Sequence, residues 1–145
     1  MKKIRAFTLL ELMITLAIVG ILVSMAYPSY SQYVTRAARS DAHIGIQSMA
    51  ARMERHYAVR NAYTDMPAVL SPEGYYTITG VTGIVDESSC TTAVSDNSAL
   101  FAYTITARPV VGGRQAGDDD CNCFLLTSTG VKGAVNSTGL TNDCW

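Results

Sequence analysis

The sequence predicts an α+β fold in which one long N-terminal α-helix packs on a small antiparallel β-sheet. Three features favour this fold: an apolar run over residues 7–27, an amphipathic helical pattern that continues to about residue 59, and β-branched or aromatic runs beyond residue 60. Of the 145 residues, 48% are hydrophobic and 16% are charged. This composition fits one small domain plus one unusually apolar segment.

The apolar run contains a single ionisable side chain, Glu11. A helix of this length rises about 30 Å, which matches the hydrocarbon core of a bilayer. The three basic residues before it are Lys2, Lys3 and Arg5. Because basic flanks stay in the cytoplasm, we expect residues 7–29 to span a membrane with a cytoplasmic N-terminus. Residues 30–145 would then form a head outside the cytoplasm.

The helical pattern continues without a break past the apolar run. Apolar residues recur three or four positions apart at Ala42, Ile46, Met49, Met53 and Tyr57. One helix over residues 7–59 is therefore predicted. Its second half needs an apolar surface to cover one face, whereas its first half is apolar all round and needs lipid or other helices.

Two residues are expected to interrupt this helix, Gly20 and Pro28. Proline removes one backbone hydrogen bond and kinks a helix, so a bend or softened turn is expected near Ala26. The alternative is that both residues are simply tolerated, as they are in many membrane-spanning helices.

Beyond residue 60 the pattern changes to short runs of β-branched and aromatic residues. Three antiparallel strands are predicted at residues 75–82, 100–107 and 123–129. Residues 131–135 add a short edge strand, and loops are expected at 86–98 and 111–120 from their Ser, Asp, Asn and Gly content.

Four cysteines lie in the last two fifths of the chain, at Cys90, Cys121, Cys123 and Cys144. Their Thr/Ser/Gly-rich surroundings favour an oxidising compartment. Three pairings exist, and a bridge between Cys121 and Cys123 is the least favourable because side chains two residues apart on a strand diverge. The other two pairings stay open on the residues alone.

Neither a metal or cofactor site nor an enzyme is predicted. The cysteines lack a second close pair, and His43 and His56 lie in the helix without a nucleophile motif nearby. The acidic run Asp118, Asp119 and Asp120 lacks the alternating ligand spacing of a calcium loop. A solvated acidic loop is the favoured interpretation of that run.

The N-terminal residues Lys2-Lys3-Ile4-Arg5-Ala6-Phe7-Thr8-Leu9-Leu10-Glu11-Leu12-Met13 resemble the signature of type IV pilins and related pseudopilins. The likeness continues through Tyr27-Pro28-Ser29-Tyr30, Met53-Glu54-Arg55-His56-Tyr57, Asn61-Ala62-Tyr63, Cys121, Gly130 and Cys144-Trp145. The later segments resemble PilE-like minor pilins more than secretion pseudopilins. The resemblance implies the type IV pilin fold, with a disulfide-closed C-terminal loop.

The resemblance also implies how the chain is processed. A prepilin peptidase would remove residues 1–6 by cutting between Ala6 and Phe7 and would methylate the new amino group of Phe7. The family usually has glycine before the cut, where this chain has Ala6.

Glu11 is implied to attract the N-terminal amine of a neighbouring subunit during assembly. Its alternative role is to lie at the lipid interface, where the helix dipole favours a negative charge. For the cysteines, the resemblance implies the pairs Cys121–Cys144 and Cys90–Cys123.

A minor pilin of this kind is implied to serve pilus assembly and pilus-dependent motility or adhesion. Its partners would be other pilin subunits through helix–helix packing, prepilin peptidase, the inner-membrane assembly machinery, and membrane lipid before assembly. It would reside in the inner membrane first and in the extracellular pilus afterwards.

Other functions stay open at this point: a major pilin, a type II secretion pseudopilin, or a DNA-uptake or adhesive subunit. The net charge of −1 and pI near 6.0 do not indicate a nucleic-acid partner. A ligand of a DNA-uptake or adhesive subunit would be contacted by a small basic patch of Arg108, Arg114 and Lys132.

Overall fold

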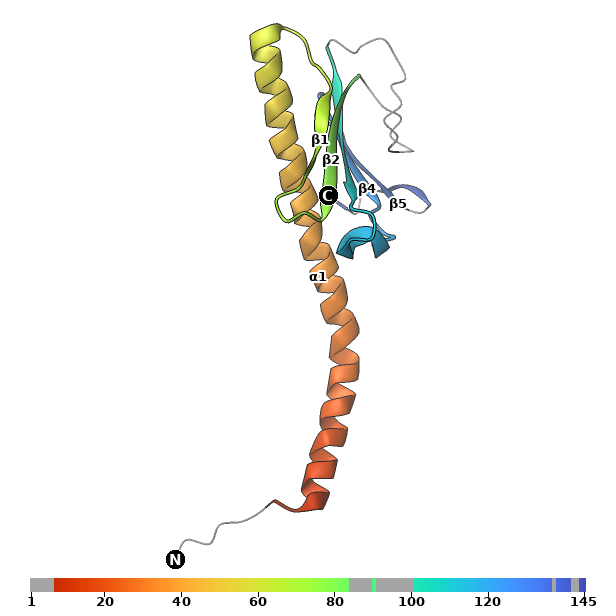
Figure 1. Cartoon of the computed structure of the whole chain (residues 1–145). Helices are drawn as coiled ribbons and strands as arrows, with labels where there is room; N and C mark the ends of the chain where they lie inside the picture. Colours follow the sequence, from red (N-terminus) through yellow and green to blue (C-terminus); the bar gives the residue numbers. More distant parts are fainter. Residues whose placement is uncertain (1–6, 84–89, 91–100, 137, 142–143) are drawn as a thin grey trace, which may run out of the picture. The chain divides into compact units, whose positions relative to one another are not determined.

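The computed structural model describes residues 7–83, 90, 101–136, 138–141 and 144–145. The chain divides into two compact units, Met1–Arg36 and Ala37–Trp145. One helix, α1 (Leu9–Arg60), contributes to both (Figure 1). Its N-terminal part makes up the described portion of unit 1, and its C-terminal part belongs to unit 2 together with a β-sheet.

The two ends of α1 are defined by local hydrogen bonds. The helix begins after Thr8, whose hydroxyl accepts a hydrogen bond from the backbone N–H of Glu11 at 3.2 Å. It ends at Arg60, because Asn61 adopts a left-handed conformation with φ of 54°. The Asn61 N–H donates to the Tyr57 carbonyl at 2.7 Å and closes the last turn. The predicted long helix is confirmed, with its start two residues later and its end one residue later than expected.

Gly20 and Pro28 both lie inside the continuous helix α1, so neither residue ends the helix. A proline removes only its own N–H donor, and the hydrogen bonds of the surrounding turns hold the helix together. The bend or softened turn expected near Ala26 stays a prediction.

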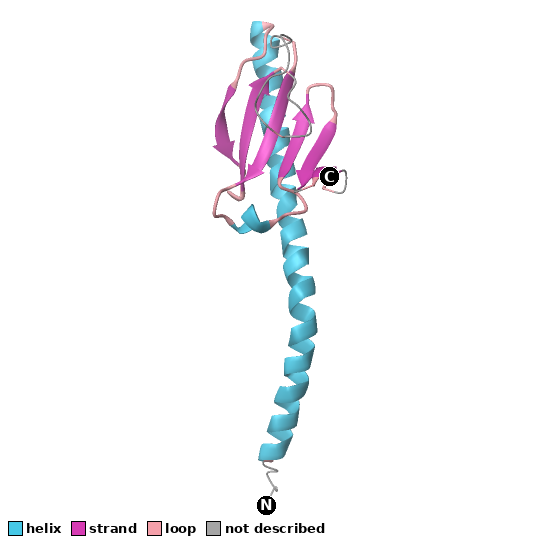
Figure 2. Cartoon of the chain, turned by 90° about the vertical axis from the view of Figure 1, so that its right-hand side faces the viewer, coloured by secondary structure: helices cyan, strands magenta, loops and turns pink. Residues whose placement is uncertain are grey.

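Unit 2 contains a six-stranded antiparallel sheet, in which every strand pairs with its neighbours in sequence (Figure 2). The strands are β1 (Met66–Leu70), β2 (Tyr76–Thr82), β3 (Tyr103–Pro109), β4 (Cys123–Thr127), β5 (Lys132–Asn136) and β6 (Gly139–Thr141). The predicted α+β class is thereby confirmed. The sequence analysis found β2 to β5 and missed the two edge strands.

The predicted strand boundaries shift at turns. β4 ends at Thr127 rather than at residue 129, because the Gly130 N–H donates to the Thr127 carbonyl at 2.9 Å and Gly130 has φ of 83°. The predicted loop at 111–120 contains a short 3-10 helix, η1 (Arg114–Gly117). The predicted loop at 86–98 and the start of the strand at residue 100 lie outside the described residues.

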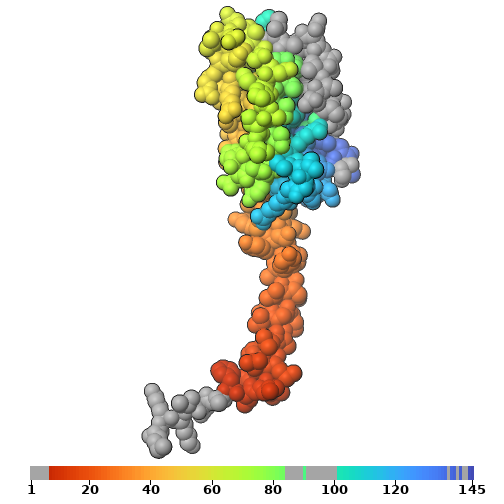
Figure 3. Space-filling model, in the orientation of Figure 1, coloured from red at the N-terminus to blue at the C-terminus, as the bar shows by residue number. Residues whose placement is uncertain are grey.

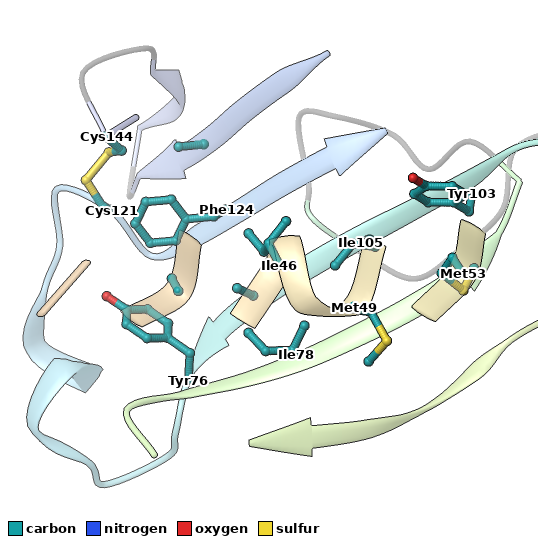
Figure 4. Packing of buried hydrophobic residues seen from close by; sticks show 13 residues of the cluster. Ile46, Met49, Met53, Tyr76, Ile78, Tyr103, Ile105, Cys121, Phe124 and Cys144 are labelled. Carbon is teal, nitrogen blue, oxygen red and sulfur yellow. A yellow bond between two sulfur atoms is a disulfide. The ribbon is translucent and has the colours of Figure 1, made fainter. Parts of the chain in front are cut away.

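The hydrophobic core of unit 2 lies between α1 and one face of the sheet. The helix contributes Ala42, Ile46, Met49 and Met53 of its predicted apolar stripe, all buried, whereas Tyr57, the last residue of that stripe, is only partly buried. The sheet contributes Tyr76, Ile78, Tyr103, Ile105, Ala107, Phe124 and Ala134. Figure 4 shows these side chains converging on the helix from neighbouring strands.

Candidate functional site

The part of α1 in unit 1 exposes apolar side chains on every side. Its large hydrophobic residues are more than half exposed throughout, from Phe7 at 77% to Tyr33 at 71%, and Figure 3 shows them uncovered on the face in view. By length and composition, α1 qualifies as a helix that could cross a membrane, with a most apolar 18-residue window of mean hydropathy 2.4. Such a surface is stable only against lipid or other helices.

Glu11 lies in the first turn of this helix and is exposed. Its backbone N–H is capped by Thr8, so Thr8 and Glu11 occupy the N-cap and N3 positions of a capping box. The sequence analysis missed Thr8, although the pattern Thr-x-x-Glu before an apolar run is the signal for it. Phe7 lies just before the cap and is exposed, whereas Ala6 lies outside the described residues.

Hydroxyl groups within the apolar part of α1 are satisfied inside the helix. Thr15 Oγ1 donates to the Leu12 carbonyl at 2.9 Å, and Ser24 Oγ donates to the Ile21 carbonyl at 2.7 Å. Because bilayer hydrocarbon offers no hydrogen-bond partners, this arrangement makes both residues compatible with a lipid environment.

Two disulfides brace unit 2, Cys90–Cys123 and Cys121–Cys144. This is the pairing that the resemblance implied. Both bridges converge on the start of β4 and lie on opposite faces of the sheet: Cys121 joins the core beneath α1, and Cys123 packs with Cys90 and Leu125 on the other face. Each closed loop removes conformational freedom from the unfolded chain and stabilises unit 2 by about 3 kcal/mol in the chain-entropy model.

The loop between β3 and β4 is joined to α1 by a bidentate ion pair. Arg39 donates from Nε and from one terminal nitrogen to the two carboxylate oxygens of Asp118, each at 2.8 Å. The hydrogen bonds that Arg39 donates to this carboxylate raise the pKa of Arg39 further above its ordinary value. The Asp118 side chain is 2% exposed, so the pair is held away from bulk water.

The acidic run is not a fully solvated loop, which corrects the sequence interpretation. Asp118 is buried in the pair with Arg39, and Asp120 also lies 3.6 Å from the same guanidinium. Only Asp119 and Asp120 are exposed. Across the part of the chain that the structure describes, no group of three or more His, Cys, Asp or Glu side chains could hold a metal ion.

The predicted basic patch of Arg108, Arg114 and Lys132 is not formed. Arg108 pairs with Thr77 across the strands, and its guanidinium donates to the Cys90 carbonyl on the sheet face away from α1. Lys132 pairs with Leu126 on the α1 side, and Arg114 lies outside the sheet in η1. Arg108 and Lys132 lie on opposite faces of the sheet because strand side chains alternate between the two faces. The sequence alone does not show which face each residue takes.

A tyrosine cluster near the C-terminal end of α1 was also missed from the sequence. Tyr103 donates to Glu54 at 2.9 Å, and Tyr63 donates to both carboxylate oxygens at 3.2 Å. The rings of Tyr57 and Tyr63 stack with centroids 4.6 Å apart. Glu54 thereby ties α1 to β3 and to the segment before β1.

The two histidines have different surroundings. His56 Nδ1 lies 3.1 Å from the Ala62 carbonyl at the end of the helix. The His43 ring lies against the indole of Trp145 on the core side of the sheet. Both histidines lie within α1, as the sequence analysis expected, and both contact other parts of unit 2.

Taken together, an apolar helical segment with an acidic first turn and a disulfide-braced sheet packed on the rest of the helix define the class of a type IV pilin. The family model described as "Type IV minor pilin ComP, DNA uptake sequence receptor" matches residues 28–127. The model of the prokaryotic N-terminal methylation motif matches residues 1–27. The chain therefore belongs to the ComP family of type IV minor pilins.

Curated relatives are similar over shorter stretches. The type IV major pilin protein PilE1 of Neisseria gonorrhoeae is 42% identical over 53 residues, which is 37% of this chain and 32% of that protein. The type IV major pilin protein PilA of Myxococcus xanthus is 33% identical over 61 residues, which is 42% of this chain and 28% of that protein. The alignments thus span about a third of the length of these relatives or less.

A solved type IV pilin from Shewanella oneidensis is 22% identical to this chain, with a TM-score of 0.48. The alignment covers 77% of this chain and 97% of that structure.

Proposed function

We propose that this chain is a structural minor pilin that is stored in the inner membrane and then incorporated into a type IV pilus. The observation that carries the proposal is the exposed apolar surface of α1 in unit 1, which exchanges lipid for the helices of neighbouring subunits. Since both environments are apolar, the exchange buries the same surface throughout. Assembly then depends on machinery and on a few specific contacts rather than on a large hydrophobic gain.

The proposed processing divides the chain into a leader (residues 1–6), a membrane and filament-core helix (residues 7–29) and a head outside the cytoplasm (residues 30–145). Prepilin peptidase cuts between Ala6 and Phe7 and methylates Phe7. The match to the methylation motif over residues 1–27 supports this step. The basic residues before the cut keep the N-terminus cytoplasmic, where assembly machinery of the inner membrane acts on it.

Glu11 is proposed to pair with the Phe7 amino group of a neighbouring subunit in the filament. An ionised carboxylate in the apolar span costs about 2 to 3 kcal/mol, which a charged partner offsets. The cap by Thr8 supports the pairing, because Thr8 satisfies the Glu11 backbone N–H and leaves the carboxylate exposed.

The experiment that tests this function is mass spectrometry of sheared, purified pili from cells that express the chain or its variants. We expect a trace component that begins at methylated Phe7. Glu11→Gln should reduce incorporation while membrane levels stay unchanged, and Thr15→Ala serves as the matched control within the same apolar span. A chain that enters pili uncut, or Glu11→Gln at wild-type abundance, would contradict the proposal.

A second candidate function is DNA uptake, and the family description "DNA uptake sequence receptor" favours it. Under this function the head binds duplex DNA through arginines that contact phosphates. Arg108 and Arg114 are exposed, but they do not form one surface with Lys132, so contacts must come from separate sites.

DNA binding is tested by titrating the purified chain with duplex DNA at several salt concentrations. Each phosphate contact contributes about 0.9 to the slope of log affinity against log salt. Arg108→Gln and Arg114→Gln should each lower that slope if they touch phosphate. The absence of measurable binding at low salt would exclude this second function and would leave the assembly role intact.

A further inference from the structure

A compact group of rings lies between α1 and the end of unit 2. The imidazole of His43 is parallel to the indole of Trp145, with centroids 4.6 Å apart and an interplanar angle of 2°. Phe124 meets the imidazole edge-on at 5.2 Å. Trp145 Nε1 donates to the Gly133 carbonyl of β5 at 2.6 Å. The indole is therefore fixed to the sheet on one side and stacked on the helix on the other.

The two nitrogens of His43 are in unequal surroundings. The ring forms a hydrogen bond with the Cys144 backbone carbonyl, so one nitrogen carries a hydrogen there. Nε2 is buried and has no hydrogen-bond partner among the described residues. A neutral imidazole tolerates this, because the second nitrogen is an acceptor without a hydrogen. Protonation would place a charged N–H donor at Nε2 with nothing to receive it, which is costly in a buried site.

The charged groups around the ring oppose protonation as well. Lys132 on β5 holds its Nζ 5.0 Å from the centroid of the same indole, so a second cation on that ring would be repelled. One turn earlier on α1, Arg39 is paired with Asp118 and Asp120 of the neighbouring loop. Phe124 of β4 contributes an aromatic ring, and the Cys144–Trp145 segment contributes the indole and the Cys144 carbonyl.

The pKa of His43 follows from these surroundings. Burial is the largest cause and lowers the pKa from its ordinary value of 6.5, and the charge of Lys132 lowers it further. The hydrogen bond to the Cys144 carbonyl opposes both effects.

We propose that His43 and Trp145 form an acid-sensitive latch: neutral His43 holds the Cys144–Trp145 segment against α1, and a proton on Nε2 opens the ring stack. The Cys121–Cys144 bridge keeps the segment attached to the start of β4 when the stack opens. Opening is therefore local, and it uncovers Trp145 and the adjoining face of Phe124. The latch gives the head a surface that changes with the acidity of its surroundings.

The direction of the pH effect follows from the two states. Water lets the imidazole of the open state charge near its ordinary value of 6.5, whereas the closed stack resists the proton. The open state therefore binds more protons below that value. The latch is closed above about pH 6.5 and loosens as the pH falls below it.

Trp145 is the single tryptophan of the chain, so its fluorescence reports the latch directly. The experiment measures acrylamide quenching of Trp145 in the full chain, in detergent micelles, from about pH 8 to about pH 5. We expect the quenching constant to rise several-fold on acidification and to return when the pH is restored. His43→Gln should remove the pH dependence, while His56→Gln, which changes the other histidine of the same helix, should keep it.

Acrylamide quenching distinguishes opening of the ring stack from protonation of His43 within a closed stack. A fluorescence change without a rise in acrylamide access would mean that His43 charges inside a closed stack, and this would overturn the latch. Persistence of the transition in His43→Gln would overturn it too. If His43→Gln does not fold, Lys132→Met decides: without the Lys132 charge the closed stack accepts a proton more easily, so the transition should move to lower pH, and an unmoved transition would refute the proposal.

Discussion

The ion pair between Arg39 and Asp118 gives a quantitative test of how unit 2 is held together. Arg39→Met keeps the aliphatic stem of the side chain and removes both donors to the carboxylate. Asp118 is left with its charge in a site where its side chain is 2% exposed. Removing one partner of a buried pair costs about 3 to 5 kcal/mol, and the 12% exposure of Arg39 places this pair near the lower value.

We expect Arg39→Met to lower the free energy of unfolding by about 3 kcal/mol, which corresponds to a fall in melting temperature on the order of 10 °C. The assay is unfolding of the full chain in detergent with its disulfides intact, followed by the fluorescence of Trp145. Trp145 belongs to unit 2, so it reports the unit that contains the pair.

Two variants complete the test. Arg52→Met changes an exposed arginine further along α1 and should alter stability by no more than about 0.5 kcal/mol. The double variant Arg39→Met with Asp118→Leu removes both charges and should recover most of the loss. A cost below about 1 kcal/mol for Arg39→Met would place the pair with ordinary surface ion pairs and would refute the reasoning.

Three further predictions use the same assay. An added Cβ at Gly45 would lie 2.8 Å from Cγ1 and Cδ1 of Ile78, so Gly45→Ala should destabilise unit 2 by about 1 kcal/mol after the gain in helix propensity, and Ile78→Val should cost less in that background than in the wild type. Tyr103→Phe should cost about 1 kcal/mol through the lost hydrogen bond to Glu54. Burial, and then the hydrogen bond and charge of Glu54, raise the pKa of Tyr103 above 10, so wild-type stability should fall above pH 10 more than that of Tyr103→Phe. An equal fall in both proteins would contradict the last prediction.

The parts of the fold that the sequence predicted are those with strong periodicity. The stripe from Ala42 to Met53 repeats at helical spacing, and it faces the sheet as expected. β2 buries alternate residues, whereas the first five residues of β3 are all buried, with Tyr103, Ile105 and Ala107 in the core that packs on α1. For the helix and β2, burial of one face produces the sequence pattern, and for β3 the β-branched and aromatic content indicates the strand.

The edge strands β1 and β6 escaped prediction for physical reasons. β1 contains Pro67 and exposes most of its side chains, so it has neither a full set of donors nor an alternating pattern. β6 has three residues, which is too short for a period. Both strands form because the sheet offers them an unpaired edge, a condition that only the folded partner supplies.

The polar contacts of the head depend on the same long-range placement. Arg39 and Asp118 are 79 residues apart, and Glu54 and Tyr103 are 49 apart. No local spacing rule predicts such pairs. The Thr8–Glu11 cap spans only three residues, so its pattern is present in the sequence although the sequence analysis missed it. The prediction of a basic patch was wrong for a related reason. The strand register, which the sequence does not show, places the predicted members on different surfaces.

The contrast between the two parts of α1 explains why one helix can serve two environments. In unit 1 the hydroxyls of Thr15 and Ser24 bond to the helix itself, so these two side chains need no other partner in an apolar surrounding. In unit 2 polar side chains of the helix instead form hydrogen bonds with other elements. Arg39 bonds to the β3–β4 loop and Glu54 bonds to β3. These cross-links hold the head together without help from neighbours. Under the proposed function, the head of such a subunit should stay folded when the subunit leaves the bilayer and enters a filament, because these cross-links lie within unit 2.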